Sequence, residues 1–162
     1  LKDLEEEVKG IYYLGLRSCR KAVYYVSPEQ IQQVIDSIIV IGDLKEIADS
    51  IIRLARIMST LRLKNELVEE IDKMIGYLQE LYEASITSYL SNNINKALVV
   101  LGKENVIMEY VGEVLEKLGE RIPVIIEEIL PVIRSSMSIA RITVSRCIRD
   151  KACRCRFFPL LE

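Results

Sequence analysis

Apolar residues recur every three or four positions almost from one end of this chain to the other, and no other feature constrains its fold as strongly. Only four prolines and seven glycines interrupt the 162 residues. The alternation of apolar and polar residues that marks a half-buried strand is nowhere sustained. The sequence therefore predicts an all-α protein built from long antiparallel helices.

Turn signals divide the pattern into five helices. Ser27 and Pro28 end the first one, and Gln30 completes a capping-box pattern with Ser27, so the second helix begins there. Pro131, inside the last helix, predicts a kink. The predicted helices cover residues 1–26, 28–58, 66–90, 94–118 and 123–149. The predicted core positions are Leu4, Val8, Ile11, Gly15, Ser18, Ala22 and Tyr25; Ile31, Val34, Ile38, Ile41, Ala48, Ile52 and Ala55; Leu67, Ile71, Met74, Leu78, Leu81, Ser85 and Ser88; Ile94, Leu98, Leu101, Asn105, Met108, Gly112 and Leu115; Ile125, Ile129, Val132, Ser136, Ile139 and Thr143.

Composition narrows the class of protein. The chain has no histidine, and so lacks the usual general base and the commonest metal ligand. No uncharged apolar run approaches the roughly 18 residues of a membrane span, and the charged N-terminus does not resemble an export signal. We expect a soluble, cytoplasmic protein that is not an enzyme and carries no cofactor. Abundant isoleucine with many Glu, Lys and Arg residues favours a thermophilic source.

The four cysteines are Cys19, Cys147, Cys153 and Cys155. The close pair in the tail is the arrangement most like a metal or redox site, but it lacks a matched second pair. A four-coordinate site would need the tail to fold back onto the first helix, and a tail disulfide is a further alternative. We interpret these residues as unpaired thiols near the C-terminus.

Positive charge gathers near the end of the chain. The residues concerned are Arg141, Arg146, Arg149, Lys151, Arg154 and Arg156, followed by Phe157 and Phe158. Such a cluster can contact phosphates or a membrane surface. We interpret it instead as a solvated helix end whose cations suit the negative end of the helix dipole, and we do not expect nucleic-acid binding.

Acidic residues on the second helix are the candidates for binding a hard cation, and Asp43 and Asp49 are the two that we single out. They lie six residues apart, about 240° around the helix axis, so one helix cannot direct both at a single ion. Lys45 and Arg53 each lie four residues from Asp49 and can pair with it. The residues alone therefore favour an exposed ion-pair face without a metal.

The same stretch resembles the signature helix of the PhoU family, phosphate-uptake regulators of bacteria and archaea. That family has a proline-started helix containing Asp-Leu-Glu-Arg-Ile-Gly/Ala-Asp. Asp43, Leu44, Ile47, Ala48 and Asp49 match this pattern. The resemblance covers about twenty residues in recognisable letters and most of the chain in helical pattern.

The resemblance implies two tandem three-helix bundles. Residues 1–62 then form a first repeat with only two helices, residues 63–150 form a second repeat with three, and residues 151–162 form a C-terminal tail. The chain begins at Leu1 rather than Met, so we expect further sequence upstream. We also expect the first helix to leave apolar surface at Ile11, Leu14 or Tyr24 that a second chain covers.

Family members bind metal clusters through acidic residues four apart on the signature helix of each repeat. Here Lys45 occupies the first of these positions, and in the second repeat the best register places Ala140 and Val144 on them. The implied ligand set is therefore reduced to Asp49, and we expect no stoichiometric metal.

The resemblance also implies a function. We expect a regulator of phosphate uptake or phosphate signalling that docks onto a protein partner, either a transporter, a sensor kinase or a fused regulatory domain. One alternative is a PhoU-like module that serves another ion-transport system or a DNA-binding regulator. A second alternative is a structural, dimerising bundle, suggested by the small residues Gly15, Ser18 and Ala22. We expect the protein to form a homo-oligomer.

Overall fold

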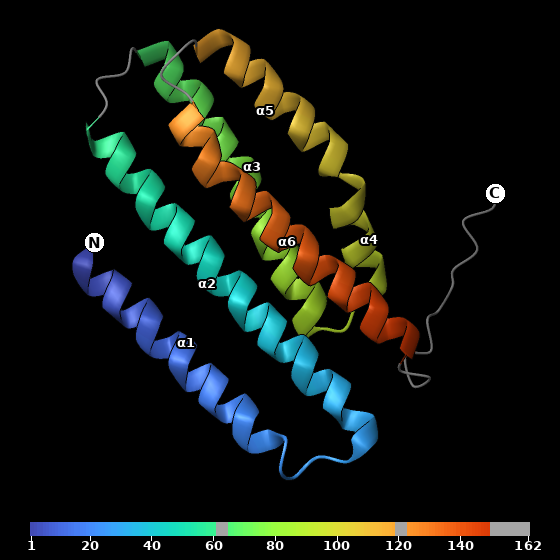
Figure 1. Cartoon of the computed structure of the whole chain (residues 1–162). Helices are drawn as coiled ribbons and strands as arrows, with labels where there is room; N and C mark the ends of the chain where they lie inside the picture. The colour runs from blue at the N-terminus through green and yellow to red at the C-terminus, as the bar shows by residue number, and fades with distance from the viewer. Residues whose placement is uncertain (61–64, 119–122, 150–162) are drawn as a thin grey trace, which may run out of the picture.

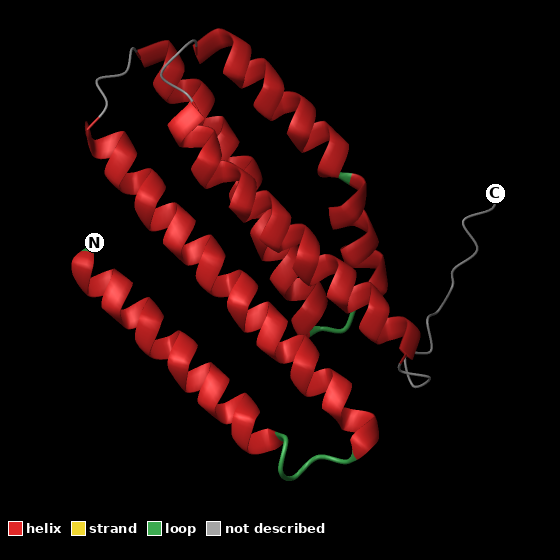
Figure 2. Ribbon diagram, viewed as in Figure 1, coloured by secondary structure: helices red, strands yellow, loops and turns green. Residues whose placement is uncertain are grey.

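The computed structural model describes residues 1–60, 65–118 and 123–149, and within these ranges the chain is helical and contains no strand (Figures 1 and 2). The all-α prediction is confirmed. The elements are α1 (Lys2–Ala22), the 3-10 turn η1 (Pro28–Gln30), α2 (Ile31–Thr60), α3 (Asn65–Leu90), α4 (Ile94–Gly102), α5 (Glu104–Leu118) and α6 (Pro123–Arg149). The capping box of Ser27 and Gln30 forms as predicted, with the Ser27 N–H donating to Gln30 Oε1 over 3.1 Å.

Helices α2 and α6 form the centre of the molecule and run antiparallel. Asp36, near the start of α2, pairs with Arg149 at the end of α6. Arg53, near the end of α2, pairs with Glu128 near the start of α6, with 2.6 Å between Nε and Oε2. Helix α1 packs against α2, whereas α3 and α4 pack against α6, so the central pair separates the two groups (Figure 1).

The side of α2 that faces α6 differs from the predicted one. Val40, Ile47 and Leu54, which lie outside the predicted stripe, join the main core. Within the stripe, Val34 and Ile52 are buried as predicted, whereas Ile31 and Ala55 are exposed. The predicted stripe instead follows the side toward α1, where Ile41 packs against Gly15. A central helix is apolar on more than one side, so periodicity alone does not indicate which side meets the core.

The predicted stripes of α3 and α6 are confirmed wherever side chains are described. Every one of those residues is buried, the serines and Thr143 included. The Ser88 hydroxyl donates to Thr143 Oγ1 over 3.4 Å, and the Thr143 hydroxyl donates to the Ile139 carbonyl over 2.9 Å. These small side chains bring α3 and α6 together, and the hydroxyls of Ser85, Ser88 and Thr143 remain hydrogen-bonded, whereas the buried Ser136 hydroxyl has no hydrogen-bond partner within the described residues. Helix α6 continues through Pro131.

The fourth predicted helix is wrong in two respects. It is divided at Lys103, whose N–H bonds to the carbonyl of Val100 three residues earlier and so tightens the turn after Gly102. In addition, Leu98, Asn105 and Met108 are exposed. The buried positions are Ala97, Val100, Ile107, Val111 and Val114. Residues 97–101 are all apolar, so spacing could not select one side.

Replacing Met137 with Ala should lower the free energy of unfolding by about 2–5 kcal/mol, because Met137 is 0% exposed within the core. Met108→Ala is the matched control, since that side chain is 43% exposed and leaves no comparable cavity. Chemical denaturation of both variants measures the two values. An equal loss of unfolding free energy in the two variants would contradict the placement of Met137 in the core and Met108 at the surface.

Candidate functional site

Asp43 and Asp49, the candidate metal ligands, meet different partners. Asp49 forms an ion pair with Lys45, whose ammonium also lies 5.6 Å from the ring centroid of Tyr12 on α1. Asp43 faces α6, where the hydroxyls of Ser138 and Ser135 act to lower the pKa of its carboxyl group. The two carboxylates therefore do not converge, in agreement with their separation around the helix.

The predicted pairing of Arg53 with Asp49 is replaced by another. Arg53 bonds to Glu128 of α6, to the Ser50 hydroxyl over 2.9 Å, and to Glu46 over 3.5 Å. A guanidinium has several donors and can bridge helices in this way. Arg53 therefore links α2 to α6, in addition to its contacts within α2.

The metal positions implied for the second repeat lie on α6. Ala140 is buried in the core, and Val144 packs partly buried against it. Among residues 1–60, 65–118 and 123–149, no group of three or more His, Cys, Asp or Glu side chains is placed to hold a metal ion. The described helices thus offer no site of the family kind.

Three cations of the C-terminal cluster are engaged within the bundle. Arg141 binds both carboxylate oxygens of Glu104, at 2.8 and 3.2 Å, and Arg149 binds Asp36. The Arg146 guanidinium lies 5.4 Å from the ring centroid of Tyr89. These contacts tie α6 to α5, α2 and α3. The remaining members of the cluster, and the two phenylalanines, lie outside the described residues.

Cys19 and Cys147 are free thiols, and Cys153 and Cys155 lie outside the described residues. The buried Cys147 thiol donates toward the Asn92 carbonyl and side-chain oxygens, at 3.4 and 3.3 Å. Asn92 adopts a positive φ of 48° in the turn before α4, and Asn93 caps α4 by accepting the Lys96 N–H. Cys147 therefore holds the end of α6 against the predicted turn at residues 91–93.

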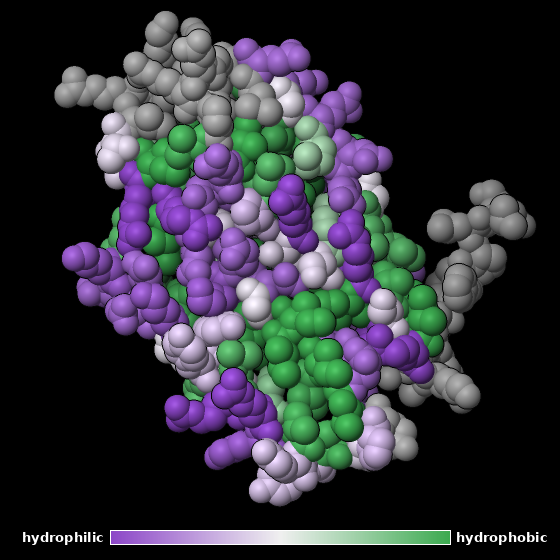
Figure 3. Space-filling view, viewed as in Figure 1, coloured by the Kyte–Doolittle hydropathy of each residue, from purple (hydrophilic) through white to green (hydrophobic). Residues whose placement is uncertain are grey.

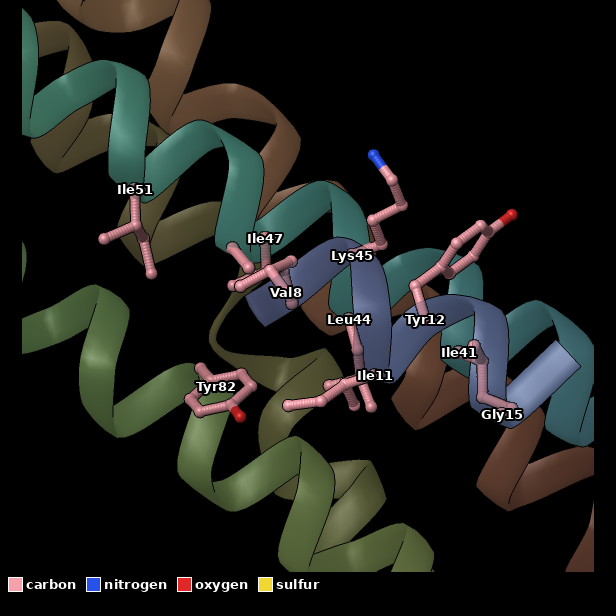
Figure 4. A pocket seen from close by; sticks show the side chains of 11 residues that line it. Val8, Ile11, Tyr12, Gly15, Ile41, Leu44, Lys45, Ile47, Ile51 and Tyr82 are labelled. Atoms are coloured by element: carbon pink, nitrogen blue, oxygen red, sulfur yellow. The ribbon is translucent and has the colours of Figure 1, made fainter. Parts of the chain in front are cut away.

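An open apolar groove of about 420 Å³ lies between α1, α2 and α3 (Figure 4). Helix α2 supplies its floor, α1 one wall and Tyr82 of α3 the other. The lining residues are Val8, Ile11, Tyr12, Gly15, Ile41, Leu44, Lys45, Ile47, Ala48, Ile51 and Tyr82. Ile11 and Tyr82 point toward one another from opposite walls, whereas the Lys45 amine points away from the groove (Figure 4).

The exposure predicted for α1 is confirmed. Ile11, Leu14 and Tyr24 are 65%, 64% and 85% exposed, and α1 contains no buried residue. The predicted core stripe of this helix is therefore wrong, and its exposed members are Leu4, Ile11, Ser18 and Tyr25. Coverage of this surface by a second chain stays a prediction. Of the small residues of α1, Gly15 packs against α2, since a Cβ there would lie 3.1 Å from Ile41. Ser18 is exposed and, with Ala22, lines an open hollow shared with α2.

A second apolar surface lies on the other side of α2. Ile31, Ile35 and Ile39 are partly exposed at intervals of four residues. Figure 3 shows hydrophobic surface in this area, over the N-terminal half of α2. Because it is a single convex row of side chains, it offers less enclosure to a partner than the groove does.

The sequence pointed to part of the groove. Val8, Ile11 and Gly15 belong to the predicted stripe of α1, and Ile41 and Ala48 to that of α2. The other lining residues were missed, because they do not belong to the predicted stripe of their own helix; they are Tyr12, Leu44, Lys45, Ile47, Ile51 and Tyr82. The signal for Tyr82 is a second apolar row on α3 at Val68, Ile75 and Tyr82, spaced by seven residues.

Comparisons with family models, curated proteins and solved structures gave no match. In the described part of the chain, no helix combines the length and the apolar character needed to cross a membrane.

Burial raises the pKa of Asp43 above its ordinary value, and the hydrogen bonds from Ser138 and Ser135 lower it only in part. The Oδ2 atom is buried and lacks a hydrogen-bond partner. Because the folded protein holds this proton more tightly than the unfolded chain, the Asp43 contribution to stability is lost as the pH rises through the folded-state pKa.

Asp43→Asn should therefore gain stability relative to the parent protein at pH 7, and this gain should shrink toward about pH 4. Denaturant titrations at both pH values measure the difference. Ser138→Ala serves as the counterpart, because loss of a donor should raise the pKa further and steepen the decline of the parent's stability with pH. A gain in stability of the Asp43→Asn variant that does not change with pH would contradict the raised pKa of Asp43.

Proposed function

We propose that this chain is a PhoU-like regulatory module that acts by docking onto a helix of a protein partner, and that it serves the control of phosphate uptake or phosphate signalling. The apolar groove between α1, α2 and α3 is the observation that carries this proposal. The PhoU-like pattern from Asp43 to Asp49, on the helix that forms the groove floor, supports the choice of system.

The groove resembles a four-helix arrangement in which one helix position is empty. Its three helices present apolar residues on three sides and leave the fourth side open to solvent. From Ile41 to Ile51 the floor is about 15 Å long, which matches roughly three turns of a bound helix. Amphipathic helices bind such grooves through apolar residues three and four positions apart, and the exposed Ile11 and Ile51 are placed to contact them.

Burial of these side chains supplies the driving force for binding. Ile11 and Ile51 are both more than half exposed in the free chain, so a bound helix removes apolar surface from water at the two ends of the contact. The floor and the walls of the groove are already helical in the free chain. Binding therefore does not require the floor or α3 to fold. The partner is a helix of a phosphate transporter, a sensor kinase or a fused regulatory domain.

Ile11→Glu and Ile51→Glu should each weaken binding to the partner at least about tenfold, because each introduces an unpaired charge into an apolar contact. The measurement is a titration of the purified protein with the ATPase subunit of the phosphate transporter and with the cytoplasmic part of the phosphate sensor kinase from the same organism.

Val106→Glu on α5 is the matched control, since Val106 is 65% exposed, as Ile11 is, and lies away from the groove. It should bind as tightly as the parent protein. Failure of the parent protein to bind either partner, together with unchanged phosphate uptake after deletion of its gene, would rule out the proposed role.

A further inference from the structure

On both walls of the groove, acidic residues lie next to lining residues in the sequence. On α1, Glu7 precedes Val8 and lies one turn from Ile11, and on α3, Glu83 follows Tyr82. Helical neighbours three or four positions apart share a face, so Glu7 lies along the edge of the α1 wall beside Ile11. Asp3, four residues before Glu7, and Asp72, eleven residues before Glu83, extend the two acidic edges.

These four carboxylates are exposed and none takes part in an ion pair within the described part of the chain. Three cations near the groove are engaged with other groups. Arg56 and Lys9 both bind Glu5, and Lys45 binds Asp49 with its amine directed out of the groove (Figure 4). The groove is therefore apolar along its floor and negatively charged along its two edges.

We infer that the ligand of this groove is an amphipathic helix of another protein whose apolar stripe is flanked on both sides by Lys or Arg residues. This inference rests on the proposed docking function and names the chemistry of the partner at that site. The apolar stripe fills the space above Ile47, Ala48 and Ile51, and the flanking cations meet Glu7 on one wall and Glu83 on the other. Such exposed charges select the partner and its orientation more than they add affinity.

Helix α1 of a second copy of this chain does not match the cation-flanked helix that we infer as the ligand. The exposed apolar side of α1, at Leu4 and Ile11, carries Asp3 and Glu7 beside it. If this side of one copy entered the groove of another, carboxylates would face carboxylates along the edge. Like charges placed opposite one another oppose association, so the groove selects against its own α1.

Three synthetic helical peptides of about 21 residues test the inference. All share one stripe of Leu and Ile residues, and the positions that flank the stripe are Lys, Gln or Glu. Fluorescence anisotropy titrations at about 50 mM and about 300 mM salt should give at least tenfold tighter binding of the Lys peptide than of the Glu peptide, equivalent to about 1.4 kcal/mol, and a smaller ratio at the higher salt.

The double variant Glu7→Lys with Glu83→Lys should reverse this preference. Its control is Glu109→Lys with Glu116→Lys, which makes the same charge change on exposed positions of α5 and should leave the preference unchanged. This control separates recognition at the groove from general attraction between a cationic peptide and an acidic protein.

Two results overturn the inference while leaving helix docking intact. One is equal affinity for the Lys and Glu peptides, with both lost in Ile11→Glu. The other is a dimer in sedimentation experiments that Ile11→Glu converts to a monomer, because a second copy then occupies the groove. Failure of all three peptides to bind overturns the inference and removes the groove as the docking site of the proposed function.

Discussion

The contact between α2 and α6 is the interaction on which the rest of the bundle depends. Along α2, the apolar residues Val40, Ile47 and Leu54 alternate with the polar residues Asp36, Asp43 and Ser50, each set repeating every seven residues. Burying a carboxylate is costly unless it is paired, and Asp36, only 4% exposed, meets Arg149, while Asp43 meets two serines of α6. A shift of α6 by one turn would separate these partners, so the polar positions fix the register of the central pair.

The sequence allowed much of the fold to be predicted, and its failures have a common physical cause. The stripes of α3 and α6 were assigned correctly down to the serines and Thr143, although α6 buries further residues such as Ile133, Met137 and Ala140 against its several neighbours. Helix α2 packs on two sides, and α4 carries apolar residues around most of its circumference, so in both cases several stripes fit equally well. Tertiary neighbours decide between such stripes, and periodicity contains no information about neighbours.

The candidate site was predictable only in part for a related reason. Exposure of Ile11 and Leu14 followed from counting helices, since an outer helix with a single neighbour cannot bury its whole apolar surface. The second wall comes from Tyr82, on a helix distant from α1 in the sequence, and no local pattern joins Tyr82 to Val8. The acidic edges follow directly from the positions of Glu7 and Glu83 once both walls are known, although in the sequence these residues are ordinary surface charges.

Helix α1 contributes no fully buried side chain, and this has a consequence for how the groove responds to a ligand. It is held to α2 by partly exposed contacts such as the Glu5–Arg56 ion pair, at 2.5 Å, and the stacking of Lys45 on Tyr12. Segments with few buried contacts open locally at a lower free energy than the core does. A ligand that touches α1 and α3 together would bind only the closed arrangement, so occupancy would slow hydrogen exchange in α1, and the measured affinity would include the free energy of keeping that helix in place.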